Sequence, residues 1–142
     1  WTIPHVPLPH NFLGMYVSVT AFRVEGFWMK IMFQLHGVTS FLQARFSPGL
    51  LKIETFSPVR DVNCTLSHWE SKEEMLRFKS SGAHLKAMKA SPKMGRGITT
   101  GWESNQFIDR KAALDRLHAE KGSLISEHDQ KDRLDAYSQR SF

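Results

Sequence analysis

The segment from Cys64 to Met88 constrains the fold most, because it joins a strand directly to a capped helix. Leu66 and His68 alternate with small polar residues up to Trp69, and this period of two is typical of a strand. Ser71 followed by Glu74 matches a capping box, in which the side chains of both residues satisfy amides at a helix start. Apolar residues then recur at helical spacing up to an interruption at Gly82 and beyond it: Met75, Phe78, Leu85 and Met88.

The same patterns predict the remaining elements. Strands are expected over Met15 to Val24, Leu50 to Phe56 and Ile98 to Ser104, because apolar and polar side chains alternate in them. A long helix is expected over Phe27 to Phe46, and a further helix begins at the N-cap Asp109 and carries Ala113, Leu114 and Leu117. Two connections are expected to be irregular: Ser57 to Asn63, which contains Pro58, and the basic, flexible loop Ser91 to Gly97.

This order of elements predicts an α+β fold: a ferredoxin-like βαββαβ unit with a four-stranded antiparallel sheet and an added C-terminal helix. Right-handed crossovers place both main helices on one face of the sheet and leave the other face uncovered. A chain of 142 residues is long enough for one such domain. We expect a proline-rich arm over residues 1–13, the domain over 14–121, and a peripheral helix or tail over 122–142.

The residues of the central segment resemble a known superfamily. Trp69-Glu70-Ser71, an acidic helix start, Met75-x-x-Phe78 and Ser81-Gly82-Ala83-His84 are similar to the antibiotic-biosynthesis-monooxygenase superfamily of dimeric α/β barrels. The branch related to spheroidene monooxygenase is the most similar. The resemblance runs from about Tyr16 to Leu117 and includes Ser47-Pro48-Gly49-Leu50 and Gly101-Trp102-Glu103. It implies a monooxygenase-like protein with an apolar pocket for an isoprenoid or polyketide-type substrate.

A partner is expected at the uncovered face of the sheet. Strands with apolar side chains on both faces cannot leave one face in water without losing its burial. In the resembled superfamily, two such sheets pack together into a dimeric barrel. We therefore expect a homodimer or another protein partner through this sheet face.

The start of the long helix points to a second surface. Phe27 to Phe33 is apolar almost all round, and such a helix is usually buried on more than one side. Core packing plus a subunit interface explains this profile, and contact with a membrane or a membrane protein is the alternative. No uninterrupted apolar run approaches the ~20 residues of a membrane-spanning helix, so no transmembrane segment is expected.

The net charge of +5 is concentrated between Lys72 and Arg96. A solvated helix face followed by a basic loop explains this excess, and an anionic substrate, haem propionates or an acidic membrane surface are alternatives. Nucleic acid is not expected as a partner, because no aromatic residues interleave with these charges.

His84 is the foremost candidate for chemistry. In the haem-degrading branch of the superfamily the iron-binding histidine follows an alanine on this helix, so the resemblance implies that His84 is a haem ligand. The branch's active-site Trp is replaced here by Phe78, and its first-strand Asn has no counterpart, so haem degradation is not expected. The cofactor is therefore haem or none. The opposing interpretation is a histidine that packs and hydrogen-bonds at a helix end.

Five further residues are candidates for the pocket lining: His68, Trp69, Phe78, Met88 and Trp102. The sequence contains no nucleophile motif, metal-binding cysteine pair or nucleotide fingerprint, so no catalytic residue is assigned. The single Cys64 excludes an internal disulfide and is interpreted as a small strand residue.

Two functions remain open. One is the monooxygenase-like enzyme. The other is a non-catalytic interaction module, or a small subunit of a larger, organellar and membrane-associated complex, which Phe27 to Phe33 favours. The chain begins at Trp1 rather than at Met, so we expect either a trimmed protein of the cytoplasm or an organellar protein that has lost a targeting peptide.

Overall fold

The computed structural model describes residues 2–3 and 14–125. Most of the predicted arm and of the predicted C-terminal helix or tail lies outside these residues. The strands are β1 (Thr2–Ile3), β2 (Met15–Val24), β3 (Leu50–Val59), β4 (Val62–Trp69) and β5 (Gly95–Ser104). The helices are α1 (Phe27–Arg45), α2 (Lys72–Lys79), α3 (Gly82–Met94) and α4 (Arg110–Lys121).

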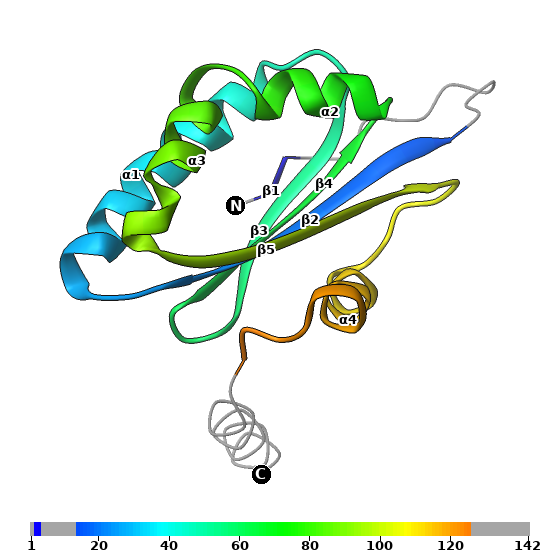
Figure 1. The fold of residues 1–142 in the computed structure, drawn as a ribbon. Coiled ribbons are helices and arrows are strands. Elements are labelled where there is room, and N and C mark those ends of the chain that lie inside the picture. The colour runs from blue at the N-terminus through cyan, green and yellow to red at the C-terminus, as the bar shows by residue number, and fades with distance from the viewer. Residues whose placement is uncertain (1, 4–13, 126–142) are drawn as a thin grey trace, which may run out of the picture.

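The sheet has the order β1-β3-β4-β2-β5, and all of its pairs are antiparallel. Without the two-residue β1 this is the strand order of a ferredoxin-like unit, so the predicted fold class is confirmed. Figure 1 shows α1, α2 and α3 over one face of the sheet and α4 against the other. Thr2 pairs with Glu54 and Ile3 with Ile53, so this part of the expected arm is an edge strand.

Both predicted N-caps are confirmed. The Ser71 hydroxyl accepts the Glu74 amide at 3.2 Å, and the Asp109 carboxylate accepts the Ala112 amide at 2.8 Å. Each bond satisfies an amide that the first turn of a helix leaves without a partner.

The predicted irregular connection over Ser57 to Asn63 is wrong. β3 continues to Val59 and β4 begins at Val62, and Asp61 turns the chain with φ of 67°. Pro58 is tolerated because the register shifts between Phe56 and Val59, and a bulge is a place where a strand can accommodate proline.

The predicted flexible loop over Ser91 to Gly97 is also wrong. α3 runs through Pro92 to Met94, and β5 begins at Gly95. Pro92 lacks the amide that would bond to the Met88 carbonyl, and the Ser91 hydroxyl donates to that carbonyl at 2.8 Å instead. Gly95 is required at the junction, because a Cβ there would lie 1.9 Å from the Arg23 carbonyl oxygen.

The uncovered sheet face that we expected is covered by α4. The main core lies there, and its members come from the sheet, α4 and the residues after it: Met15, Val17, Val19, Ala21, Leu51, Val62, Cys64, Leu66, Ala113, Leu114, Leu117, Leu124 and Ile125. The packed domain therefore extends at least to Ile125. A dimer through this sheet face stays a prediction, and it would require α4 to move.

The burial expected for α1 is not found within the described chain. Only Ala44 of this helix is buried, and several large apolar side chains face outward: Phe27, Trp28, Ile31, Met32, Leu35 and Leu42. The alternation of strand residues thus places the main core under α4 rather than under α1.

We predict that Leu117→Ala destabilises the domain by ~2–5 kcal/mol, because Leu117 is fully buried and its loss leaves a cavity in the core. Leu76→Ala on α2 is the matched control, because 46% of Leu76 is exposed, and it should lower stability by less than ~1 kcal/mol. Urea unfolding measures both. Equal effects would mean that α4 is not part of the core.

Candidate functional site

The floor of the candidate site is the sheet face beneath α1 and α3. Side chains on a strand alternate between its two faces, so the residues next to the buried valines of β2 and β4 point toward the helices. Seven hydroxyl side chains of the strands line this floor: Ser18, Thr20, Thr55, Ser57, Thr65, Ser67 and Thr99. Thr20 and Thr99 lie 2.9 Å apart between their hydroxyl oxygens, and Thr99 donates to the Val19 carbonyl at 3.1 Å. The floor therefore carries many hydroxyl groups beside the apolar side chains of Phe22, Ile53 and Trp69, whereas the opposite face of the sheet is mainly apolar.

The roof is mainly apolar. It is formed by α1 and α3, with Phe33, Val38, Phe41, Ala87 and Met88 among the lining residues. Between roof and floor lies a cavity of about 720 Å³, within the ~300–1,000 Å³ typical of small-molecule sites. Ser40 of α1 also lines it, and the Ser40 hydroxyl is buried without a hydrogen-bond partner in the described residues. A ligand oxygen in the cavity would satisfy that hydroxyl.

His84 lines this cavity from the first turn of α3. Its Nδ1 lies 3.1 Å from the Lys79 carbonyl oxygen, which can only accept, so Nδ1 carries the proton and Nε2 keeps a free lone pair. Burial lowers the pKa of His84, and the bond to the Lys79 carbonyl opposes that shift only in part. The imidazole is therefore neutral at pH 7.

Gln43 of α1 fixes the position of His84. Its side-chain oxygen accepts the His84 amide at 2.8 Å, and its nitrogen donates to the Ser81 carbonyl at 2.9 Å and to the Phe78 carbonyl at 3.2 Å. One side chain thus ties α1 to the junction between α2 and α3. Sequence reasoning missed Gln43, because nothing in a helical pattern indicates a side chain that caps a different helix.

Three more of the predicted site residues gather at the same cavity. Trp69 is fully buried, donates from Nε1 to the Ser67 hydroxyl at 2.9 Å, and stacks on Phe78 at 5.1 Å between ring centroids. The Phe78 ring in turn lies 4.6 Å from the His84 ring. Met88 lines the cavity and is 45% exposed. The structure therefore brings Trp69, Phe78, His84 and Met88 together.

Trp102 lies on the other face of the sheet. It packs against the core under α4, and the guanidinium of Arg116 sits 4.3 Å from its ring centroid. It does not line the cavity.

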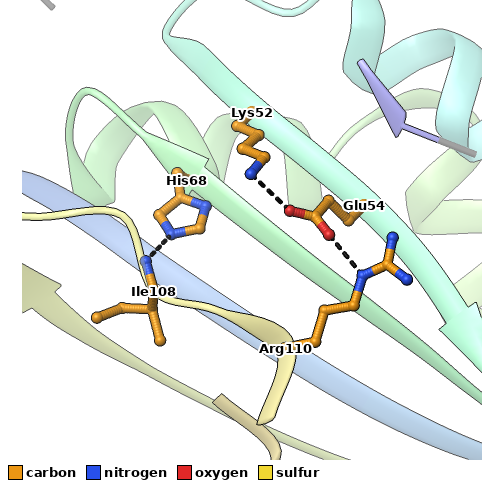
Figure 2. A network of polar contacts seen from close by, with 5 residues as sticks. All are labelled: Lys52, Glu54, His68, Ile108 and Arg110. Carbon is orange, nitrogen blue, oxygen red and sulfur yellow. Dashed lines mark hydrogen bonds and ion pairs between the residues drawn. The ribbon is translucent and has the colours of Figure 1, made fainter. Parts of the chain in front are cut away.

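His68 also faces α4 rather than the cavity. It is fully buried, and its Nε2 accepts the amide of Ile108 at 3.0 Å, as Figure 2 shows. Its Nδ1 has no hydrogen-bond partner in the described residues. Burial, together with the nearby Lys52 cation, lowers the pKa of His68 to about 4 against the opposing effect of Glu54. His68 therefore holds the segment that leads into α4.

Glu54 forms the second tie to α4. Lys52 approaches one carboxylate oxygen at 2.7 Å and Arg110, the first residue of α4, approaches the other at 2.6 Å (Figure 2). Burial by itself would raise the pKa of Glu54, but the hydrogen bonds from Lys52 and Arg110 outweigh it and hold that pKa below its usual range. The pair of cations keeps a nearly buried carboxylate ionised.

The remaining reactive side chains offer little chemistry. Burial raises the pKa of the Cys64 thiol to about 12, so the reactive thiolate does not form at pH 7. Within residues 2–3 and 14–125, no three His, Cys, Asp or Glu side chains gather as a metal site. In the same part of the chain no helix is long and apolar enough to cross a membrane. The basic residues of α2 and α3 are mostly exposed, and Lys79 lines the cavity.

Comparisons with known proteins identify the fold. No family model and no curated protein matches the sequence. Among solved structures, the chain is similar to SnoaB, a cofactor-independent oxygenase from Streptomyces nogalater, with 13% identity over 68% of this chain and 99% of SnoaB and a TM-score of 0.56.

Two further structures agree. A protein from Nitrosomonas europaea, whose name assigns it to the antibiotic biosynthesis monooxygenases, has 13% identity over 68% of this chain and 95% of its own, with a TM-score of 0.56. Rv0793 from Mycobacterium tuberculosis has 9% identity over 67% of this chain and 98% of its own, with a TM-score of 0.54. The fold is therefore that of antibiotic-biosynthesis-monooxygenase-like proteins, and about a third of this chain lies outside the match.

We predict that His68→Gln flattens the stability profile between pH 7 and pH 5. The folded-state pKa of His68 is below the unfolded value, so its contribution is present above about pH 6.5 and is lost as the pH falls. For a folded pKa of about 4, the loss between pH 7 and pH 5 is about 2 kcal/mol. A glutamine amide oxygen accepts the Ile108 amide without titrating. Urea unfolding at the two pH values measures the difference, and an unchanged slope in His68→Gln would contradict it.

Proposed function

We propose that this chain is an enzyme that oxidises an oxygen-bearing aromatic ring system of the polyketide type in the cavity beneath α1 and α3. The proposal rests on one observation: a single cavity combines an apolar roof, a hydroxyl floor and the free Nε2 of His84. The monooxygenase-like fold supports it, as does the activity named for SnoaB, a cofactor-independent oxygenase.

The floor favours a polyketide-type substrate over an isoprenoid hydrocarbon. A hydrocarbon would return no hydrogen bond to the hydroxyls of Ser18 and Thr65, whereas the Thr20 hydroxyl keeps Thr99 as its partner. A buried hydroxyl without a partner costs about 1–3 kcal/mol, so Ser18 and Thr65 select against a ligand without oxygen atoms. A flat ring system with phenol or carbonyl oxygens along one side satisfies the floor and places its ring faces against Phe33 and Phe41.

The reaction class is oxidation of an activated ring methylene by O2. His84 Nε2 removes one proton and leaves a carbanion whose charge spreads onto the ring carbonyl oxygen. The carbanion reduces O2 and takes the proton back as a hydroperoxide, which loses water to leave a new carbonyl. In total a CH2 group and O2 become C=O and H2O, so the substrate supplies all the electrons.

The residues of this chain fit that chemistry. A general base must be unprotonated at the working pH, and burial, which lowers the pKa of His84, favours its neutral form at pH 7. Donors aimed at the oxygen that gains charge stabilise the carbanion, and the hydroxyls of the floor and the Lys79 cation line the same space. Trp69 and Phe78 exclude water on the side of His84.

Haem binding is the second candidate for this cavity. A histidine that binds iron typically donates its other ring N–H to a carbonyl, and the bond from His84 to the Lys79 carbonyl has that form. His84 would hold the iron, the apolar roof would contact the porphyrin, and Lys79 would pair with a propionate. The bound group would supply O2 activation. The exposed apolar face of α1 favours a third role, as an interaction module or a subunit of a larger complex.

We predict that His84→Ala lowers kcat/KM for a hydroxylated anthrone by ~10²–10⁴-fold, because the general base is lost. O2 consumption and quinone absorbance measure the rate. His68→Gln, which alters the opposite face of the sheet, is the control and should keep the rate of the unaltered chain. Equal rates for His84→Ala and His68→Gln would exclude His84 as the base.

The same proteins distinguish the haem candidate. The proposed enzyme turns over the anthrone without added haemin. A Soret band that forms with haemin, is lost in His84→Ala and retained in His68→Gln, together with no anthrone oxidation, would replace the cofactor-independent proposal with haem binding.

A further inference from the structure

The outward face of α1 carries an apolar stripe, which we define as Phe27, Trp28, Ile31, Leu35, Val38, Leu42 and Phe46. From Trp28 to Leu42 the spacing alternates between three and four residues, which is the pattern of helices that pair side by side. The exposed fractions are 72% for Trp28, 65% for Leu35 and 79% for Phe46. The stripe therefore faces away from the described body of the chain, and α3 packs beside α1 over the same face of the sheet (Figure 1).

The exposed area of the stripe is large enough for a stable interface. Its three aromatic side chains present roughly 150–250 Å² each when fully open, so together they expose roughly 300–550 Å². Ile31, Leu35 and Leu42 add exposed fractions of 42%, 65% and 48%. The sum approaches the ~800 Å² per partner of a standard protein interface, and exceeds what isolated surface apolar residues explain.

The charges around the stripe favour a protein over a membrane surface. Helices that lie on membranes carry many Lys and Arg residues beside their apolar face. The only Lys or Arg residues of α1 are Lys30 and Arg45, and Lys30 is paired with Asp61 at 2.6 Å. A cationic rim for anionic lipid is therefore absent from this helix.

We propose that the stripe is the contact surface for a second copy of this chain, with the two α1 helices antiparallel about a two-fold axis. A two-fold contact requires a patch that is complementary to itself, and the stripe meets that requirement because Lys30, the one Lys or Arg residue between Phe27 and Leu42, is paired with Asp61. In the antiparallel arrangement Arg45, in the last turn, lies beside the partner's Glu25, which precedes the first turn. Both residues are exposed.

This contact is independent of the substrate cavity. The cavity lies on the inner side of α1, and of the stripe residues only the partly buried Val38 also lines it; the others lie on the outer side. It also differs from a dimer through the sheet, because that face holds α4. A result that excludes the dimer contact therefore does not exclude the proposed substrate site, and the reverse also holds.

Analytical ultracentrifugation of the full chain tests the proposal. The unaltered chain should sediment as a dimer, and Leu35→Glu should weaken the dimer by at least tenfold and leave a monomer. Leu76→Glu is the matched control, because Leu76 is an exposed leucine outside the stripe, and it should leave the dimer intact. Circular dichroism should show both variants folded.

Charge reversal tests the antiparallel arrangement. Glu25→Arg and Arg45→Glu should each weaken the dimer, and the double variant should restore it. A monomeric unaltered chain would overturn the proposal, as would a dimer that survives Leu35→Glu. A chain that stays monomeric and co-sediments with phosphatidylcholine vesicles would assign the stripe to a membrane instead. If the chain dimerises only after residues 126–142 are removed, the stripe would be assigned as the contact surface for that segment.

Discussion

The alternation of side chains along β2 and β4 is the constraint on which the rest of the structure depends. Val17, Val19 and Leu66 are fully buried on one face, and hydroxyl residues occupy the other. In a ferredoxin-like unit the two main helices usually need apolar strand residues beneath them. Here the apolar face packs on α4, so α1 and α3 stand over a polar floor that they cannot fill. The cavity follows from this distribution.

The position of α4 depends on two partly buried polar contacts. The bond from the Ile108 amide to His68 fixes the chain before the helix, and the ion pair of Glu54 with Arg110 fixes its first turn. α4 occupies the sheet face, and most of the large exposed apolar side chains among the described residues lie on the outer side of α1. The cavity and most of the proposed dimer contact therefore lie on opposite sides of the same helix.

Much of the fold could be predicted from the sequence, because periodicity and caps are local signals. The bounds of β2 and α1 and the caps Ser71 and Asp109 agree with the structure to within one residue. Pro58 and Pro92 predict interruptions of regular structure, but a bulge accommodates Pro58 and the Ser91 hydroxyl bonds to the carbonyl that Pro92 leaves without an amide.

The site was only partly predictable. His68 does not line the cavity together with its neighbour Trp69, because adjacent residues of a strand face opposite sides of the sheet. The positions of Thr20, Thr65 and Thr99 in the two-residue alternation of their strands could have revealed the hydroxyl floor. The face that α4 covers could not be predicted, because it is set by contacts between residues far apart in the chain.

The proposed function requires that a ligand binds in the space between the hydroxyl floor and the apolar roof. Amide chemical shifts measured during titration with a hydroxylated anthrone are the decisive measurement. The largest changes should fall on the strand residues Ser18, Thr20 and Thr99 and on His84 at the cavity wall. Changes confined to Ala113 and Leu117 of α4, or no changes at saturating ligand, would contradict it.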